Sequence, residues 1–306
     1  MELIQKIIEP IIEYGLREEL HHGDHTAQNI VEPGQIMSAK IFLKQAGIVA
    51  GLPIADMTFK MLDPDCEIEF WVRDGQECER GQVLMSMTGK AWIFSAGERP
   101  AVDYLQHLSG IATKTNGYVK LVEPYKARVT DTRKGISAIR YLQNYAVTLG
   151  GGLIHQSSLH NVIFVKDSHI KMAGGSLAET IRRLRSRIQP MFRIDVECET
   201  MERVQECLDL EIESVLLDNM SVEETRRAVD FIDGRMETEA SGGITEETVV
   251  EFAKTGVDRI AIGNLKHSAS VIDISLVIDT GDVEQLKPSA KQVMKHEKTG
   301  APQTAS

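Results

Sequence analysis

The feature that most constrains the fold is a regular alternation of strand-like and helix-like segments between residues 127 and 264. Six short strand-like segments, each ending in polar residues or glycine, read ARVTDTRK, NVIFVKD, FRIDVECE, SVLLDN, METEASGG and RIAIGN. The amphipathic segments between them read ISAIRYLQNYAVTLG, SLAETIRRLRSRI, TMERVQECLDL, SVEETRRAVDFI and TEETVVEFAKTG. This alternation predicts a parallel sheet with right-handed helical crossovers, and it leaves open whether the sheet is open or closed into a barrel.

The sequence up to about residue 97 predicts a helix followed by mixed strands. In CEIEFWVRDG the apolar residues Ile68, Phe70 and Val72 alternate, and the following Asp-Gly pair indicates a turn. GQVLMSMTG and KAWIFSAG continue in the same strand-like manner. From residue 98 onward apolar residues recur at helical spacing, which predicts a long helix that connects two domains.

These patterns divide the chain into domains. We expect an N-terminal α/β domain over residues 1–115, completed by the segment 268–285, and a second α/β domain over residues 116–267. The polar stretch 286–306, with scattered Pro and Gly, predicts a flexible tail.

Composition excludes several classes of partner. The net charge of −11 argues against a nucleic-acid or anionic-membrane surface, because both need a basic footprint. No apolar stretch is long enough to span a bilayer, and the N-terminus lacks the basic and apolar regions of a signal peptide. The four cysteines form no CxxC pair and are expected to be reduced, mostly buried thiols. We therefore expect a cytoplasmic protein.

Charged residues or glycines stand at the carboxyl end of every predicted strand. In chain order these ends are Arg133-Lys134, Lys166-Asp167, Glu197, Asp218-Asn219, Ser241-Gly242-Gly243 and Gly263-Asn264. Ligands of parallel α/β sheets and barrels bind at this edge. The six strand ends therefore predict one functional face.

The residue types indicate the chemistry of that face. Two strand ends that carry cations predict a carboxylate or phosphate ligand. The carboxylates Glu197 and Asp218 can hold Mg²⁺ or stabilise a developing positive charge, or they can form salt bridges with the nearby cations. The SGG and GN turns offer backbone N–H groups to a phosphate. The combination predicts a phosphorylated substrate, a metal ion and an acidic co-substrate.

The order of the motifs resembles one enzyme family. GERPAVDYLQHLSGIAT, DTRK, YAVTLGGGLIHQSSL, VKDSHI, DVECET, LLDNM, EASGGI and IGNLKHS resemble the motif series of quinolinate phosphoribosyltransferase, also called decarboxylating nicotinate-nucleotide pyrophosphorylase. The resemblance implies an α/β N-terminal domain followed by an incomplete, open α/β barrel of about six parallel strands. It also implies a homodimer or higher oligomer with shared sites, and the conversion of quinolinate and phosphoribosyl pyrophosphate to nicotinate mononucleotide, diphosphate and CO₂.

The resemblance also implies a role for each matching residue. The aromatic acid would bind to Arg99 of the neighbouring subunit and to Thr132, Arg133, His155, Gln156 and Lys166. The phosphoribosyl group would bind to Lys134, Ser241, Gly242, Gly243, Gly263, Asn264 and His267. Catalysis would rest on Lys134, Glu197 and Asp218, and the two carboxylates would also hold Mg²⁺.

Three residues depart from the family motifs. Gly135 and Pro100 stand where the family usually has threonine, and Gln156 stands where it has an arginine that binds a substrate carboxylate. Gln156 and Gly135 favour an alternative, a phosphoribosyltransferase of the same scaffold for another heteroaromatic acid. A second alternative is a non-catalytic nucleotide-binding relative, because a fold does not by itself confer activity. His21, His22 and His25 resemble a metal cluster, but such a segment is more often structural than zinc-binding, and the sequence does not decide their role.

Overall fold

The computed structural model describes residues 3–155, 159, 162–189 and 191–279. These residues form two compact units, Gly110–Ser270 and Ile4–Ser109 together with the chain from Val271. The tail predicted over 286–306 and the predicted site residue Gln156 lie outside the described residues. Within the described part of the chain, no helix is both long and apolar enough to span a membrane.

The Gly110–Ser270 unit is built on a six-stranded parallel sheet with the order β6-β11-β10-β9-β8-β7. The strands are β6 (Arg128–Thr130), β7 (Ile163–Val165), β8 (Ile194–Cys198), β9 (Ser214–Asp218), β10 (Glu237–Ser241) and β11 (Arg259–Ala261). Every strand pairs with its neighbour along the chain, except that β6 pairs with β11 and no described ladder joins β6 to β7. The six predicted strands and the open α/β barrel are therefore confirmed.

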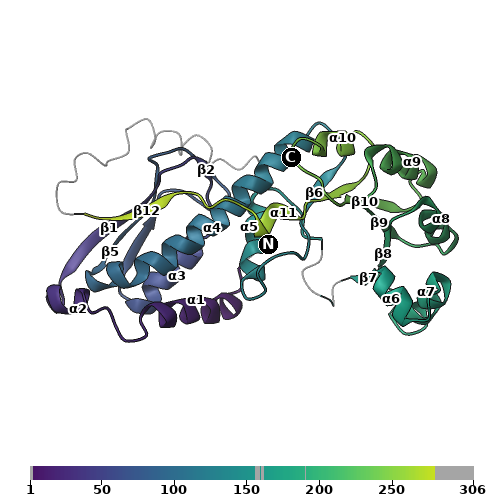
Figure 1. The fold of residues 1–306 in the computed structure, drawn as a ribbon. Coiled ribbons are helices and arrows are strands. Elements are labelled where there is room, and N and C mark those ends of the chain that lie inside the picture. The colour runs from purple at the N-terminus through teal and green to yellow at the C-terminus, as the bar shows by residue number, and fades with distance from the viewer. Residues whose placement is uncertain (1–2, 156–158, 160–161, 190, 280–306) are drawn as a thin grey trace, which may run out of the picture. The chain divides into compact units, whose positions relative to one another are not determined.

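Amphipathic helices connect these strands and cover the outer face of the sheet (Figure 1). They are α5 (Arg140–Leu149), α6 (Asp167–Met172), α7 (Leu177–Arg185), α8 (Met201–Asp209), α9 (Val222–Ile232) and α10 (Val249–Ala253). The short helix α11 (Asn264–His267) follows β11, the last of these strands along the chain. Helix α9 begins at a capping box, in which the Ser221 hydroxyl accepts from the Glu224 N–H and the Glu224 carboxylate accepts from the Ser221 N–H. Apolar side chains of β7–β9 and α6–α9 form the core beneath the strand edge.

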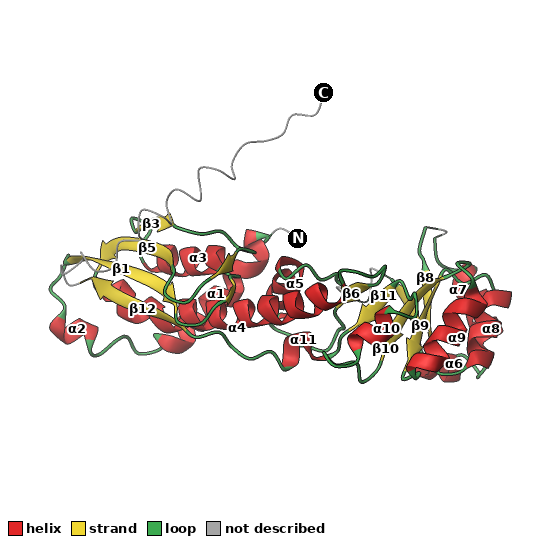
Figure 2. Cartoon of the chain, turned by 90° about the horizontal axis from the view of Figure 1, so that it is seen from above, coloured by secondary structure: helices red, strands yellow, loops and turns green. Residues whose placement is uncertain are grey.

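The other unit is an antiparallel sheet of order β12-β1-β5-β3 that packs on helices (Figure 2). Its strands are β1 (Ile36–Leu43), β3 (Glu67–Phe70), β5 (Val83–Lys90) and β12 (Ile274–Asp279), with β2 (Gly47–Ile48) and β4 (Glu77–Cys78) in a separate pair. Its helices are α1 (Gln5–Glu19), α2 (Ala27–Ile30), α3 (Leu52–Leu62) and the first half of α4 (Trp92–Val122). The Asp24 carboxylate accepts from the N–H groups of Thr26 and Ala27, so the segment that carries the three histidines organises the entry to α2.

The expectation that KAWIFSAG forms a strand is wrong, because helix α4 already begins at Trp92. The aromatic and β-branched residues of this short apolar run suit either element, so its periodicity does not decide between them. Packing decides: Ile93 and Phe94 are fully buried in the core, and a Cβ on Gly97 would lie 2.7 Å from the ring of Phe59. Gly97 therefore lets α4 pack closely against Phe59 of α3, where any side chain would clash.

Candidate active site

A pocket of about 760 Å³ lies at the carboxyl edge of the parallel sheet. Strands β6 to β10 each contribute residues at or just beyond their ends. The predicted site residues that line it are Thr132, Arg133, Lys134, His155, Lys166, Glu197, Asp218 and Ser241. The structure thus brings eight of the predicted residues to one place.

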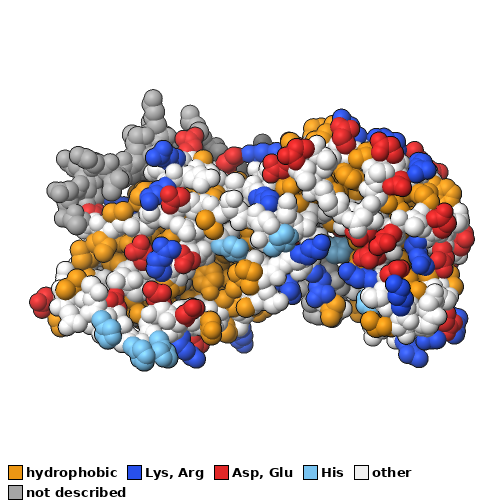
Figure 3. Space-filling view, viewed as in Figure 1, with side chains coloured by type: hydrophobic (Ala, Val, Ile, Leu, Met, Phe, Trp, Pro, Cys, Tyr) orange, Lys and Arg blue, Asp and Glu red, His pale blue; other side chains and the backbone are white. Residues whose placement is uncertain are grey.

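The pocket is lined by cations, and one of them has an N–H group that makes no hydrogen bond among the described residues. The Nε atom of Arg133 is buried and has no hydrogen-bond partner among the described residues. The Lys166 ammonium lies 3.6 Å from the Glu197 carboxylate and 5.2 Å from the centre of the Phe164 ring. Over β7–β9, Lys and Arg side chains lie beside Asp and Glu side chains at the surface (Figure 3). A buried guanidinium N–H without a partner favours an anionic ligand at this wall.

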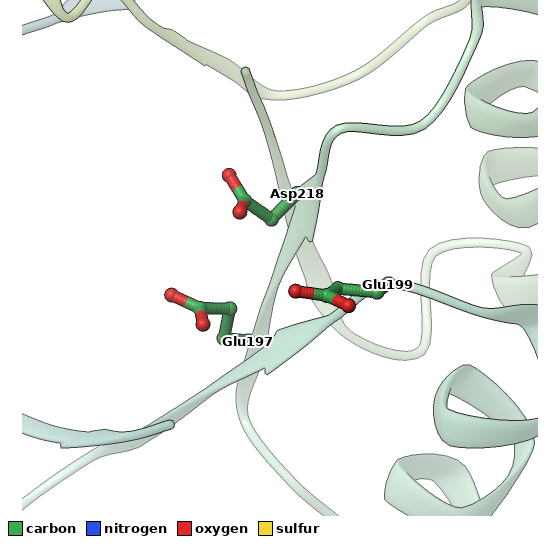
Figure 4. A group of neighbouring side chains, drawn as sticks. All are labelled: Glu197, Glu199 and Asp218. Carbon is green, nitrogen blue, oxygen red and sulfur yellow. The ribbon is translucent and has the colours of Figure 1, made fainter. Parts of the chain in front are cut away.

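Three carboxylates converge beside these cations. Glu197 at the end of β8, Glu199 just beyond it and Asp218 at the end of β9 each offer an oxygen, and these oxygens lie within 4.8 Å of one another (Figure 4). Burial raises the pKa of Glu197, Lys166 opposes this increase, and the charges of Asp218 and Glu199 add to it. The cluster therefore carries more negative charge than Lys166 neutralises. Closely spaced carboxylate oxygens are the donor set that Mg²⁺ prefers.

The turn after β10 requires glycine. Gly242 has a φ of +101° and Gly243 a φ of +61°, in the left-handed region. A Cβ on Gly242 would lie 2.3 Å from the Oδ1 atom of Asn219, whose N–H donates to the carbonyl of Ser241. The neighbouring turn after β11 also approaches the pocket, because a Cβ on Gly263 would lie 3.8 Å from the Lys134 side chain.

The remaining predicted residues lie away from the pocket wall or outside the described residues. Asn264 and His267 belong to the short helix α11, and the His267 ring is hydrogen-bonded to the Ser268 hydroxyl. Arg99 belongs to the other unit, is exposed, and forms an ion pair with Asp103 one turn along α4. Gln156 is not described.

Sequence reasoning missed three groups around the site. Glu199 is one, although the alternation of a strand places it on the face of Glu197, two residues earlier. The second is Lys266, whose buried ammonium lies 2.5 Å from the Asp131 carboxylate and 2.9 Å from the Asn144 side chain. The third is the buried Glu239, in contact with His155. The last two have no sequence signal, because their neighbours in METEASGG and GNLKHS are themselves mostly polar.

Comparisons with known proteins agree with this site. The sequence models of the quinolinate phosphoribosyl transferase N-terminal and C-terminal domains match residues 24–109 and 111–277. The chain is 34% identical to a probable nicotinate-nucleotide pyrophosphorylase [carboxylating] of Bacillus subtilis, over 88% of this chain and 92% of that protein. It is also 34% identical to the mitochondrial quinolinate phosphoribosyltransferase [decarboxylating] 2b of Nicotiana tabacum, over 84% of this chain and 78% of that protein.

Solved structures give the same result. NadC from Streptococcus pyogenes superposes with a TM-score of 0.86 at 31% identity, over 91% of this chain and 99% of that one. Nicotinate-nucleotide pyrophosphorylase from Ehrlichia chaffeensis superposes with a TM-score of 0.86 at 32% identity, over 91% of this chain and 100% of that one. With the motif order, the open barrel and the pocket, these matches show that the chain belongs to the quinolinate phosphoribosyltransferase family.

Proposed function

We propose that the chain transfers a phosphoribosyl group from phosphoribosyl pyrophosphate to quinolinate with loss of CO₂, giving nicotinate mononucleotide for NAD biosynthesis. The observation that carries this proposal is the convergence of Arg133, Lys166 and the Glu197–Glu199–Asp218 cluster on one pocket. The relatives whose names print this activity match along most of their own length.

The carboxylates are suited to the first chemical step. Departure of diphosphate leaves an oxocarbenium-like ribose, and preorganised anions stabilise such a charge in the transition state. Glu197 and Asp218 occupy neighbouring strand ends and face the same pocket, so we assign them to the ribose. The glycine turn after Ser241 would hold the 5′-phosphate with its backbone N–H groups.

The cations are suited to the acceptor. Quinolinate carries two carboxylates, and Arg133, His155 and Lys166 line one side of the pocket. Once the ring nitrogen bonds to ribose it becomes cationic, and it accepts the electron pair released when the adjacent carboxylate leaves as CO₂. Neutralising the remaining carboxylate without blocking the leaving one is the task of these side chains.

The acidic cluster also fits a divalent metal ion. We propose that Glu197 and Asp218, with Glu199, hold Mg²⁺. When bound, the ion would supply positive charge to the diphosphate leaving group.

Another heteroaromatic acid is the alternative to quinolinate as the acceptor. A Cβ at Gly135 would lie 2.6 Å from the Gln143 carboxamide oxygen, which accepts from the Ile136 N–H. The amide of Gln143 thus fills the space that a side chain at position 135 would need. Gly135 directly follows Lys134 of the pocket wall, and its departure from the family motif favours a changed acceptor, as does the missing arginine at Gln156.

Two further features are proposed with this function. We propose at least a homodimer in which Arg99 of one subunit reaches the other subunit's pocket, because Arg99 is exposed and belongs to the other unit of the chain. We also propose a cytoplasmic location, which the four buried, free cysteines support.

The test is a reaction of the purified protein with phosphoribosyl pyrophosphate, Mg²⁺ and a panel of aromatic acids, with diphosphate and CO₂ measured separately. Quinolinate should yield both products in equal amounts. Diphosphate without CO₂ would identify a non-decarboxylating acceptor. Neither product with any acid would identify a binding relative.

A further inference from the structure

The interior of the barrel beneath the pocket is charged rather than apolar. Glu237 and Glu239 alternate on β10 and share a face with Ser241 of the pocket wall. The Arg259 guanidinium of β11 donates to both carboxylates, with Nε 2.9 Å from Glu239 and NH1 2.5 Å from Glu237. A second pocket of about 250 Å³ borders this network and is also lined by His155. His155 thus lies where the charged interior meets the active-site pocket.

Three donors surround the Glu239 carboxylate. The Thr130 hydroxyl lies 2.8 Å from Oε1, Arg259 Nε lies 2.9 Å from Oε2, and His155 Nδ1 lies 2.9 and 3.1 Å from the two oxygens. Glu239 is 2% exposed, so water contributes little to its solvation. An ionised carboxylate only accepts, and the Nδ1 atom of His155 must therefore carry the proton of this bond.

The His155 ring is fixed from three sides. Its backbone N–H donates to Asp131, Glu239 binds Nδ1, and Phe164 packs edge-on with ring centres 5.4 Å apart. No described hydrogen bond is made by the other ring nitrogen, Nε2, and the residue lines the acceptor pocket. The ring is therefore anchored through Nδ1, and Nε2 is the nitrogen available to a ligand.

We propose that Glu239 is a positioning residue that holds His155 as an imidazolium, so that the histidine binds the anionic acceptor as a cation. The inference deepens the proposed function and rests on it for the identity of the acceptor. Glu239 touches no substrate; it acts through the histidine, with Thr130 and Arg259 holding its carboxylate in place.

The charges around both groups favour this protonation state. Burial alone lowers the pKa of His155, but the hydrogen bond and charge of Glu239, with the charges of Asp195 and Asp131, raise it above its usual value. Burial alone raises the pKa of Glu239, but the His155 bond and charge, followed by Arg259 and Thr130, lower it. Two cations on nearby segments are themselves paired with carboxylates, Arg259 with Glu239 and Arg193 with Glu237.

The test begins with the free protein, so that it does not depend on which acceptor is used. Imidazole ¹⁵N resonances of the wild type are titrated by NMR, and His155 is assigned by its loss in His155→Gln. We expect the His155 midpoint to lie above about 6.5, the usual histidine value. In Glu239→Gln the midpoint should fall by at least about one pH unit. The control is Glu237→Gln, which removes a carboxylate that pairs with Arg193 and Arg259 but leaves the Glu239–His155 bond in place. Its midpoint should fall by much less than that of Glu239→Gln, because only Glu239 contacts the His155 ring.

Kinetics then separate a charge effect from a structural one. Wild-type kcat/KM for quinolinate should fall as pH rises through the His155 midpoint, because the imidazolium is lost. Glu239→Gln should lose about ten- to a hundredfold at pH 7.5, with little change in KM for phosphoribosyl pyrophosphate. The loss should shrink at pH 6, where the histidine of the variant regains its proton.

Three results would overturn the inference. One is a wild-type His155 midpoint at or below 6.5, a measurement that does not depend on whether a Glu239 variant folds. The second is an unchanged midpoint in Glu239→Gln. The third is an equal loss of activity at every pH, as a merely structural role predicts. If the enzyme is inactive on every acid while the NMR results hold, the proposed function fails and the Glu239–His155 pairing stands.

Discussion

Replacing Lys266 by methionine should destabilise the Gly110–Ser270 unit by about 3–5 kcal/mol near neutral pH, because it removes one partner of a buried ion pair. Lys266 and Asp131 are 2% and 1% exposed, and their side chains are 2.5 Å apart. Without the ammonium, the Asp131 carboxylate keeps the His155 N–H as a donor and the charge of the His155 ring, but it loses the cation that contacts it directly. Most of the predicted loss is the penalty of burying this anion without a contacting cation.

The loss should depend on pH in a defined direction. Burial already raises the pKa of Asp131, and Lys266 is the main group that opposes the increase. Removing Lys266 raises this pKa further, so the folded variant holds a proton at pH values where the unfolded chain, with an ordinary Asp, has released it. Stability of the variant therefore rises relative to wild type as pH falls through the new pKa. The defect should be largest at pH 8 and smaller at pH 5.

Urea unfolding followed by far-UV circular dichroism measures the effect. Both tryptophans, Trp71 and Trp92, belong to the other unit, so tryptophan fluorescence in the same samples reports whether that unit is affected. Lys254→Met is the matched control, because Lys254 forms an exposed pair with Glu251 and should cost less than about 1 kcal/mol. Asp131→Asn combined with Lys266→Met removes both charges and should recover most of the loss. A Lys266→Met defect no larger than the control, or one equal at pH 5 and pH 8, would refute this account of the pair.

Three further predictions concern the site. Glu197→Gln or Asp218→Asn should lower kcat by about 10²- to 10³-fold with little change in Tm, and a kcat equal to wild type in either variant would remove its proposed role. Mixing an Arg99→Ala chain with a Lys166→Ala chain should restore part of the activity, since one hybrid site keeps both residues; demonstrated subunit exchange without recovery would argue against a shared site. If quinolinate is the acceptor, Gln156→Arg should improve its kcat/KM by about 1–3 kcal/mol, through an added bidentate contact. If the natural acceptor has one carboxylate, the same change should impair the enzyme, so the sign of the effect on the native substrate decides between the two.

Much of the barrel could be predicted from sequence because its signals are local. Most strands of this unit are short apolar runs that end in a polar residue or glycine, and they alternate with amphipathic segments. Ser221 and Glu224, three residues apart, mark the start of α9. The convergence of Glu197 and Asp218 also follows from local reasoning, since parallel neighbouring strands end at the same edge.

The parts that escaped prediction depend on contacts between distant segments. Lys266 and Asp131 are 135 residues apart, and Glu239 meets His155 across 84 residues, so neither pairing has a signature in either segment alone. The sequence does not predict the start of α4, because the apolar run around Ile93 and Phe94 is compatible with both a strand and a helix. The helix is decided by tertiary packing, in which Gly97 lies against Phe59. The role of Gln156 stays a prediction.

The pairing of early strands with late ones has a consequence for how the protein is made. Strand β1 lies between β5 and β12, and β6 pairs with β11, so each unit is completed by one of the last strands of the chain. During synthesis, β1 therefore presents a bare edge from the time β5 leaves the ribosome until residues 274–279 emerge. At ~5–20 residues per second, that interval is roughly ten to forty seconds. An unpaired eight-residue strand is a template for wrong partners during that time. Nascent chains that stall before β12 are accordingly the species most exposed to aggregation and to capture by chaperones.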